Sequence, residues 1–537
     1  MSVNFGDVFD MIGQTANSDG AAIICDGQIT TWKEFDSKSN ALARALLGYG
    51  LQLQAKVGLY MRNGPEYLIS FVACLKARLV PVNINFRYGP IEIDYLLSNS
   101  DAEVVIFDPE FRDNIPSATN AMPLIRISTG ARILDELSLE EIFEVHDEPL
   151  RLTRSPDDIF LLYTGGTTGL PKGVMWPSSA LWGALAASRA ADPLKPPPMT
   201  VEALESQLRS EPQGICYSIP PPFMHGTGLF AALSVMSRAG TVVCSRAPSF
   251  DPVATLDAIV RHQCVGLVIV GDAFATPLVQ ALAAEPHRWD VTGITNIVSS
   301  GMMWSPEVKS AMLTHMPEAV LVDGLGATEA ASIAVSVTTK NLRAQEAVFT
   351  PADTIVVDPE TLLPLAPGSS TIGLIAKAGD LPLGYYKDPE RTAKTYVVIN
   401  GVRRLISGDH ATVDQYGTIH FLGRGNLCIN TAGEKVYPEE VEQALKSYPE
   451  VTDALVFGLA DPKLGQRVVA LVAAPEDVKA SLLISHVKKM LAKYKAPKQV
   501  VVCPGVPRAP NGKADYVEAT KIFKSVSLIE ALAKTER

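Results

Sequence analysis

The chain has 537 residues and only seven cysteines, no two of which are spaced as C-x-x-C. It therefore offers neither a zinc motif nor a disulfide framework, and we expect reduced thiols, as in a cytosol. No apolar stretch reaches the length that crosses a bilayer. The start of the chain is acidic and lacks the basic and apolar segments of a signal peptide. We therefore expect a soluble, cytoplasmic protein.

The sequence also lacks an excess of positive charge. Its formal net charge is −11, which argues against general binding to nucleic acids or anionic membranes. Hydrophobic residues make up 47% of the chain and charged residues 20%, as in globular rather than disordered proteins. A phosphate site would therefore be a local arrangement of dipoles and a few cations.

The chain is too long for one ordinary core, so at least two domains are expected. In its first part, segments with helical periodicity alternate with short β-branched runs, which predicts α/β layers with mostly parallel strands. Residues 192–212, rich in proline and charge, are predicted to form an exposed insertion. The predicted helices are 32–47, 65–77, 92–98 and 257–262, and the predicted strands are 56–61, 79–83, 103–108 and 265–270.

After about residue 424 the pattern changes to that of a small α+β domain. The helix 482–494 is basic and amphipathic, and a solvated helix face is favoured over membrane binding. The other predicted elements are the helix 438–447 and the strands 451–458, 467–473 and 499–502.

The most informative segment is the run YTGGTTGLPKGV at residues 163–174. Its glycines allow positive φ and close approach of the backbone, and turned N–H groups form an anion site. Threonine hydroxyls and Lys172 add donors and a positive charge, so we predict a loop that holds polyphosphate. It is not a Walker A loop, because no Gly-Lys-Ser/Thr follows four free positions. The alternative is a surface turn.

Four further motifs follow in order. Residues 324–329 come after the apolar run 319–322 and are expected at a strand end, where open α/β sheets bind ligands. Residues 407–409 place a carboxylate in a turn. Residues 423–424 follow a predicted strand, and residues 510–513 place a lysine on a tight turn near the C-terminus.

These five motifs in this order resemble the adenylate-forming superfamily of acyl-CoA synthetases, peptide-synthetase adenylation domains and luciferases. The resemblance covers nearly the whole chain. It implies an α/β fold with a large N-terminal adenylation domain, residues 1–424, of layered sheets with a β-barrel-like subdomain. A small, mobile α+β C-terminal domain, residues 425–537, would carry the catalytic lysine. The resemblance also implies ATP, Mg²⁺ and coenzyme A as cofactor and co-substrates.

The resemblance assigns roles around the reacting phosphate. Glu329 would hold Mg²⁺, a hard cation that prefers oxygen ligands, and Thr328 would reach the α-phosphate. Lys513 would bridge the attacking carboxylate and the α-phosphate as a positioned cation. The alternatives are a charge at a helix N-terminus for Glu329 and a solvated turn lysine for Lys513.

The resemblance also implies a nucleotide site. Asp409 would accept both ribose hydroxyls, unless it only forms an Asx-turn, and Arg424 would donate to the ribose. Leu325 departs from the usual aromatic residue, so adenine would rest on an aliphatic face, while Asp323 could contact its amino group. The whole set is Thr164, Gly165, Gly166, Thr167, Thr168, Lys172, Asp323, Gly324, Leu325, Asp409 and Arg424.

The second half-reaction in the family is thiolysis, for which the small domain swings about a hinge. The hinge position here is Asn426 rather than the usual Asp or Lys, and asparagine tolerates changes in φ and ψ. Gly433, Glu434 and Lys435 would lie at the thiol channel, unless their loop merely precedes a helix.

The acyl pocket is expected around residues 218–229, whose His225 would lie beside the substrate carboxylate. Asp272 is the one strong charge, so an α-amino acid stays open as a substrate. The motifs look most like those of bacterial fatty-acid and steroid or terpenoid CoA ligases, and this resemblance, together with the apolar character of the other walls, implies a medium-to-large hydrophobic acid. These walls are Phe223, Met224, Leu229, Gly271, Ala273, Gly301, Met302, Met303, Gly326 and Ala327.

Other functions stay open at this point. The acyl group could pass to a carrier-protein thiol in trans, since only 24 residues follow Lys513. A non-catalytic nucleotide-binding regulator would have lost the reacting-centre residues, whereas Glu329 and Lys513 are present. Luciferase-like oxidation and a homodimer are neither favoured nor excluded by the sequence.

Overall fold

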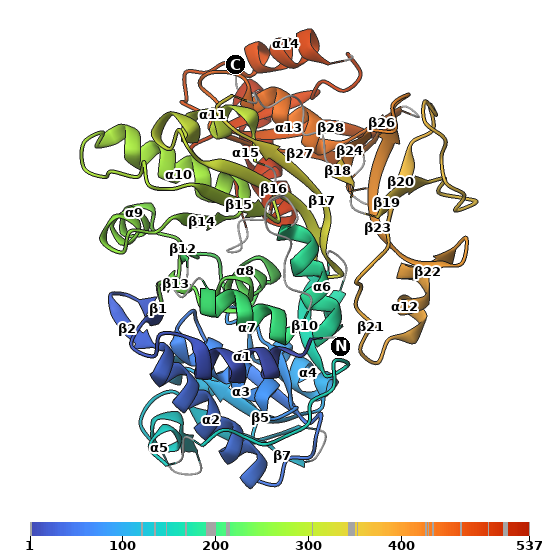
Figure 1. Cartoon of the computed structure of the whole chain (residues 1–537). Coiled ribbons are helices and arrows are strands. Elements are labelled where there is room, and N and C mark those ends of the chain that lie inside the picture. The colour runs from blue at the N-terminus through green and yellow to red at the C-terminus, as the bar shows by residue number, and fades with distance from the viewer. Residues whose placement is uncertain are drawn as a thin grey trace.

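The structure is a computed structural model. A large N-terminal domain contains three sheets, and a small C-terminal domain, from Ile429 onward, contains a fourth (Figure 1). The described residues are 3–119, 122–133, 136–145, 148–166, 169–189, 200–210, 215–302, 304–341, 350–351, 353–424, 427, 429–431, 434–461, 464–491, 493–508 and 514–535. In these ranges, no helix is long and apolar enough to cross a membrane.

The first sheet has nine strands, in the order β18 (Thr350–Pro351), β17 (Ala330–Thr338), β16 (Val320–Ala327), β15 (Asn296–Ser300), β14 (Gly266–Ile269), β12 (Cys216–Ser218), β13 (Thr241–Cys244), β1 (Ala21–Cys25) and β2 (Gln28–Thr31). The strands from β16 to β1 are parallel, and the strands at the two edges are antiparallel. Helices α8 (Gly226–Met236), α9 (Pro252–Arg261), α10 (Gly271–Ala284) and α11 (Pro306–His315) connect its strands.

The second sheet has eight strands, in the order β21 (Gly384–Tyr385), β11 (Gly169–Pro177), β10 (Ile159–Gly166), β4 (Val80–Asn83), β3 (Lys56–Tyr60), β5 (Ala102–Phe107), β8 (Ile125–Ser128) and β9 (Leu137–Ser138). It is parallel from β10 to β9, as predicted. A short ribbon, β6 (Ala118–Thr119) and β7 (Met122–Pro123), and a 3₁₀ helix, Pro109–Asn114, lie beside it in sequence. The remaining helices of this part are α1 (Phe5–Thr15), α2 (Trp32–Gly48), α3 (Pro65–Lys76), α4 (Pro90–Ser100), α5 (Leu139–Phe143), α6 (Ser178–Arg189) and α7 (Val201–Ser210).

Local sequence explains where several helices begin. Thr31 and Glu34 form a capping box at the start of α2, and the Asp251 side chain accepts two backbone N–H groups at the start of α9. Proline occupies the first turn of α3, α4, α9 and α11, where no intrahelical donor is lost.

The third sheet is antiparallel and takes the place of the predicted barrel-like subdomain. Its strands are β19 (Thr354–Val357), β20 (Gly373–Lys377), β23 (Val402–Val413), β22 (Tyr396–Ile399) and β24 (Ile419–Arg424), with α12 (Pro389–Thr395) before β22. Among the described residues, no hydrogen-bonded pairing joins the edge strands β19 and β22, so these strands do not close the sheet into a barrel.

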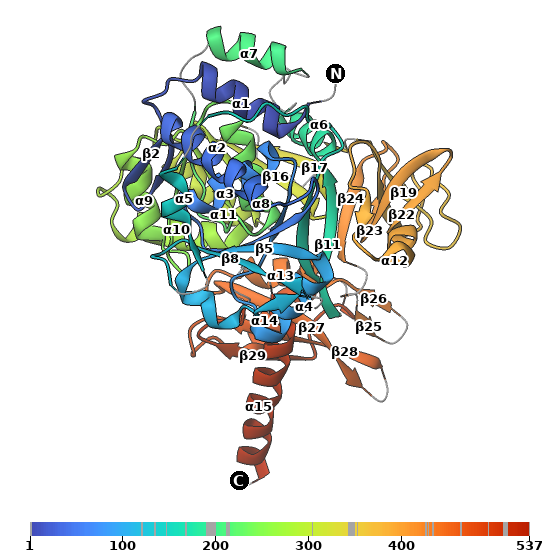
Figure 2. The same ribbon diagram turned by 90° about the horizontal axis from the view of Figure 1, so that it is seen from below.

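The small domain pairs β27 (Asp453–Asp461) with β28 (Gly465–Ala473), as predicted. Its other elements are β25 (Ile429–Thr431), β26 (Glu434–Val436), β29 (Gln499–Cys503), α13 (Pro438–Lys446), α14 (Ala480–Met490) and α15 (Tyr516–Thr535). In Figure 2, α15 projects away from the rest of the molecule. No hydrophobic cluster contains described residues from both sides of residue 424. The predicted boundary itself adjoins residues 425–426, outside the described residues, and stays a prediction.

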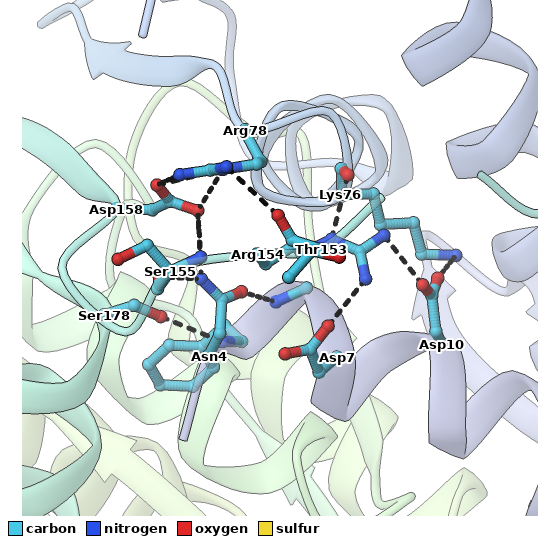
Figure 3. A network of polar contacts seen from close by, with 12 residues as sticks. Asn4, Asp7, Asp10, Lys76, Arg78, Thr153, Arg154, Ser155, Asp158 and Ser178 are labelled. Atoms are coloured by element: carbon cyan, nitrogen blue, oxygen red, sulfur yellow. Dashed lines mark hydrogen bonds and ion pairs between the residues drawn. The ribbon is translucent and has the colours of Figure 1, made fainter. Parts of the chain in front are cut away.

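A polar network ties the N-terminus to the base of the β10–β11 hairpin (Figure 3). Asn4 Nδ2 donates to the carbonyl of Ser155 at 2.6 Å, and the Phe5 N–H donates to Ser178 Oγ at 2.8 Å. Arg78 donates to Asp158 at 2.9 Å. Because Asp158 directly precedes β10 and Ser178 directly follows β11, both ends of the hairpin are fixed.

Most predicted elements are confirmed with shifted ends, but two descriptions were wrong. Residues 163–166 and 169–174 belong to the two strands of a long antiparallel hairpin rather than to an open loop. Residues 407–409 lie inside β23, where its register with β20 shifts, rather than in a turn. Within the predicted insertion 192–212, the described residues 200–210 include the helix α7, most of whose side chains are not buried and which lies beside α1 in Figure 2. The predicted turn 510–513 lies outside the described residues.

Candidate active site

The tight turn between β16 and β17 presents Thr328 and Glu329. Sequence reasoning expected the strand to end at residue 322, but β16 continues to Ala327. The indole Nε1 of Trp176 donates to the Thr328 carbonyl at 2.8 Å, and the Tyr385 hydroxyl donates to Glu329 Oε1 at 2.7 Å. The carboxylate of Glu329 is thus oriented by a residue far away in the sequence.

The β10–β11 hairpin places Thr164 directly opposite Lys172. Next to them, Tyr163 lies opposite Gly173, and a Cβ at Gly173 would lie 2.7 Å from the Tyr163 ring. Ring packing therefore leaves no room for a side chain at Gly173. Thr164 and Lys172 lie near the end of the described strands, where a hydroxyl and an ammonium group could serve phosphate oxygens.

Asn83, at the end of β4, connects this hairpin to the segment before α8. Its Nδ2 donates to the carbonyl of Tyr163 at 3.2 Å and to that of Met224 at 2.5 Å, and its Oδ1 accepts the Tyr163 N–H. Sequence reasoning missed Asn83, Trp176 and Tyr385. A signal existed for Asn83, since it is a polar residue at the carboxyl end of a predicted parallel strand.

The segment around His225 is held by backbone contacts. His225 is the N-cap residue of α8, and its N–H donates to the Pro222 carbonyl at 3.1 Å. Asn63 accepts the Phe223 N–H at 2.7 Å. The side chains of Phe223, Met224 and Leu229 are almost fully buried, so an acyl pocket beside them stays a prediction.

The β15–β16 region contains the predicted adenine contacts. Asp323 is buried and accepts from Lys309 Nζ at 2.7 Å. Burial raises the pKa of Asp323, and the neighbouring Lys309 ammonium opposes that rise. Any contact of Asp323 with adenine would be made while Lys309 holds one carboxylate oxygen. Leu325 is half-buried and packs against the main core.

Asp409 occupies the bulge in β23 and is only 3% exposed. Gly408, immediately before it, has a φ of +76°, which favours glycine. Asp409 lies opposite Arg424 in the pairing of β23 with β24. The two residues expected to bind the ribose are therefore cross-strand partners at the backbone.

The carboxylate of Asp272, at the start of α10, faces the small domain. Its Oδ1 accepts from the N–H and the Oγ of Ser305 at 2.9 and 3.1 Å, and its Oδ2 accepts from Lys446 Nζ at 2.7 Å. Gly271 and Gly301, nearby, have φ values of +50° and +95°.

A cavity of about 700 Å³ lies between the two domains. Its walls include Asp272, Asp453, Arg508 and Arg87. In the part of the chain that the structure describes, Arg87 Nη1 is buried and has no hydrogen-bond partner. Burial, with repulsion from Arg62, lowers the pKa of Arg87 to about 10. An anion beside this guanidinium would offset both effects.

The profile of the family described as AMP-binding enzyme matches residues 13–386, and that of the AMP-binding enzyme C-terminal domain matches residues 440–513. The chain belongs to this adenylate-forming family. Its two matched regions correspond to the large and the small domain.

Known family members are similar to this chain over most of their length. A protein of Mycolicibacterium smegmatis named medium/long-chain-fatty-acid--CoA/3-oxocholest-4-en-26-oate--CoA ligase is 35% identical, with 96% of each chain covered. A 3-oxocholest-4-en-26-oate--CoA ligase of Rhodococcus rhodochrous is 33% identical, with 92% of this chain and 91% of that protein covered. ATP-bound MatB from Rhodopseudomonas palustris has the same fold, with a TM-score of 0.80, 23% identity, and 98% and 100% coverage.

Several family-derived assignments stay predictions. Lys513, Met303, Gly433, Thr167, Thr168 and Asn426 lie outside the described residues. Arg424, Glu434 and Lys435 are placed in strands, but their side chains are not described. The structure does bring Glu329 and the phosphate hairpin together, through Tyr385 and Trp176.

The divalent cation expected beside ATP stays a prediction. No group of three or more His, Cys, Asp or Glu side chains in the described ranges could hold a metal ion by itself. Mg²⁺ does not require such a group, because it is commonly bound through one or two carboxylates together with substrate phosphates. Glu329 supplies such a carboxylate, partly exposed and held through one oxygen.

Proposed function

We propose that this protein is an ATP-dependent acyl-CoA ligase that activates a hydrophobic carboxylic acid as an acyl-adenylate and transfers it to the thiol of coenzyme A. Family membership and the CoA-ligase names of the two relatives support the proposal. The observation that carries it is the linkage of Glu329 to the phosphate hairpin. Tyr385 bonds Glu329, and its strand β21 pairs with β11.

In the first half-reaction, a carboxylate oxygen of the acid forms a bond to the α-phosphorus of ATP. The bond from that phosphorus to the bridging oxygen breaks, and pyrophosphate leaves. Thr164 and Lys172 would hold the outer phosphates, and Lys513 would bring the two anionic reactants together. Glu329 would hold Mg²⁺, which screens phosphate charge when bound.

In the second half-reaction, the thiol of coenzyme A loses its proton, and its sulfur forms a bond to the acyl carbon. The bond from that carbon to the AMP oxygen breaks, and AMP leaves. The cavity between the domains would admit coenzyme A, and Arg87 would donate to one of its phosphates.

The proposed acid has a large apolar body and no amino group. Asp272 is already bonded by Ser305 and Lys446, which makes it a poor partner for the ammonium group of an amino acid. The two relatives carry the names of fatty-acid and steroid-acid ligases. We place the protein in the cytoplasm, where ATP and coenzyme A are available and its thiols stay reduced.

The decisive test is carboxylate-dependent exchange of pyrophosphate into ATP, without coenzyme A, across fatty, aryl, steroidal, terpenoid and amino acids. We expect exchange with fatty or steroidal acids, and formation of the CoA thioester when coenzyme A is added. If the acyl group is transferred only to a carrier protein, that protein and not coenzyme A is the acceptor. Absence of exchange across the panel, with ATP binding intact, would contradict adenylation itself.

A further inference from the structure

We propose that Tyr385 is a positioning residue that fixes the carboxylate of Glu329 against the phosphate hairpin and so sets the affinity of the site for its divalent cation. The inference rests on the proposed role of Glu329. It adds a residue and a physical coupling that neither the motifs nor the names of the relatives supply.

The first step is geometric. Tyr385 reaches Glu329 through its side chain and the hairpin through its backbone. Its hydroxyl lies 2.7 Å from Glu329 Oε1, and it stands opposite Val174 in the pairing of β21 with β11. Lys172 lies two residues before Val174 on β11. One residue thus connects the metal carboxylate with the strand that carries the phosphate-binding lysine.

The second step concerns rigidity. The Tyr385 side chain is largely buried, and its N–H donates to Thr392 Oγ1 at 2.9 Å. The preceding residue, Gly384, has a φ of +140°, and a Cβ there would lie 2.2 Å from Thr392. The tyrosine therefore holds its position through contacts that do not involve Glu329.

The third step concerns the proton. The Tyr385 hydroxyl carries the proton of this hydrogen bond and donates it, because an ionised carboxylate can only accept. With Oε1 engaged by this donor, we assign Oε2 of Glu329 to the cation. Partners of this kind orient a ligating carboxylate, and their loss typically costs about 10- to 100-fold in metal affinity.

The test compares Tyr385→Phe with Tyr386→Phe. The first change removes the hydroxyl that bonds Glu329, whereas the second removes a neighbouring hydroxyl that bonds Asp101 Oδ2 at 2.9 Å. Mn²⁺ binding, in the presence of a non-hydrolysable ATP analogue, is measured by electron paramagnetic resonance. Thermal unfolding of each variant confirms that it is folded.

We expect Tyr385→Phe to weaken Mn²⁺ binding by about 10-fold or more and Tyr386→Phe to leave it unchanged. Pyrophosphate exchange by Tyr385→Phe should then recover at high Mg²⁺. Unchanged Mn²⁺ binding in Tyr385→Phe, with weakened binding in Glu329→Gln, would overturn the role of Tyr385 alone. Unchanged binding in both would remove Glu329 from the metal site, whether or not the wild-type protein catalyses exchange.

Discussion

Lys446 of the small domain donates to the carboxylate of Asp272 in the large domain, with Nζ 2.7 Å from Oδ2. Both side chains are about nine-tenths buried, with exposed fractions of 9% and 10%. No hydrophobic cluster of described residues joins the two domains. A second polar contact, between His410 Nδ1 and the Tyr437 hydroxyl at 2.7 Å, lies on the same boundary. Polar contacts of this kind can be exchanged for water when a domain reorients.

Lys446→Met should loosen the docking of the small domain. The change leaves Asp272 buried without its cation, and removing one member of a buried ion pair costs about 3–5 kcal/mol. Separation of the domains would let water reach Asp272, so we expect faster hydrogen exchange in α10 and α13. Lys488→Met, on the exposed side of α14, is the matched control. Equal exchange in both variants would show that the ion pair does not hold the domains together.

Local spacing was enough to predict the elements. The predicted helices 32–47 and 65–77 correspond to α2 and α3, and the strand 499–502 corresponds to β29. These signals are short-range, because a capping residue or a periodic apolar face lies within the element itself. The order of five motifs singled out Glu329 and Asp409 as site candidates, but it placed the end of β16 too early and Asp409 in a turn.

Contacts between distant segments could not be predicted in this way. Tyr385 and Glu329 are 56 residues apart, and Lys446 and Asp272 are 174 apart. Nothing in the sequence around Asp272 distinguishes a pocket wall from a docking partner. The strand pairing of the glycine-rich motif could not be predicted for a related reason, since Gly173 makes room for the ring of its cross-strand neighbour Tyr163.

Arg87→Met should raise the KM for coenzyme A by about tenfold or more, the scale of one charge-assisted hydrogen bond. Methionine retains apolar contact with Phe86, over whose ring the guanidinium carbon lies at 4.6 Å. Pyrophosphate exchange, which needs no coenzyme A, should be unaffected. Arg209→Met on α7, where the arginine pairs with Glu205 at the surface, is the control. An unchanged KM for coenzyme A would show that Arg87 does not contact a phosphate of coenzyme A.

Lys513→Ala should slow adenylation by about 100-fold or more, the scale of losing one electrostatic partner of the transition state. Thiolysis of a supplied acyl-adenylate should survive much better, because the lysine is assigned only to the first half-reaction. Rapid-quench measurement of each half-reaction separates the two. Equal losses in both would contradict the assignment of the two half-reactions to different orientations of the small domain.

Glu442 gives the small domain a pH-dependent stability. Its side chain is buried and accepts from the Val456 N–H at 2.9 Å. Burial raises the pKa of Glu442 from 4.5 to about 7, and repulsion from Glu439 adds to the rise. Between these two values the folded domain binds a proton that the unfolded chain does not. Stability is therefore lost as the pH rises from about 4.5 to about 7.

Glu442→Gln should remove this dependence, because the amide keeps an acceptor for Val456 and carries no charge. The wild-type domain should lose about 2 kcal/mol of opening free energy between pH 5 and pH 7.5, and the variant should lose little. Hydrogen exchange in β27 and β28, corrected for intrinsic rates, measures this energy. Glu476→Gln, at an exposed site after β28, should behave as the wild type. A pH dependence that persists in Glu442→Gln would mean that a group other than Glu442 binds the proton.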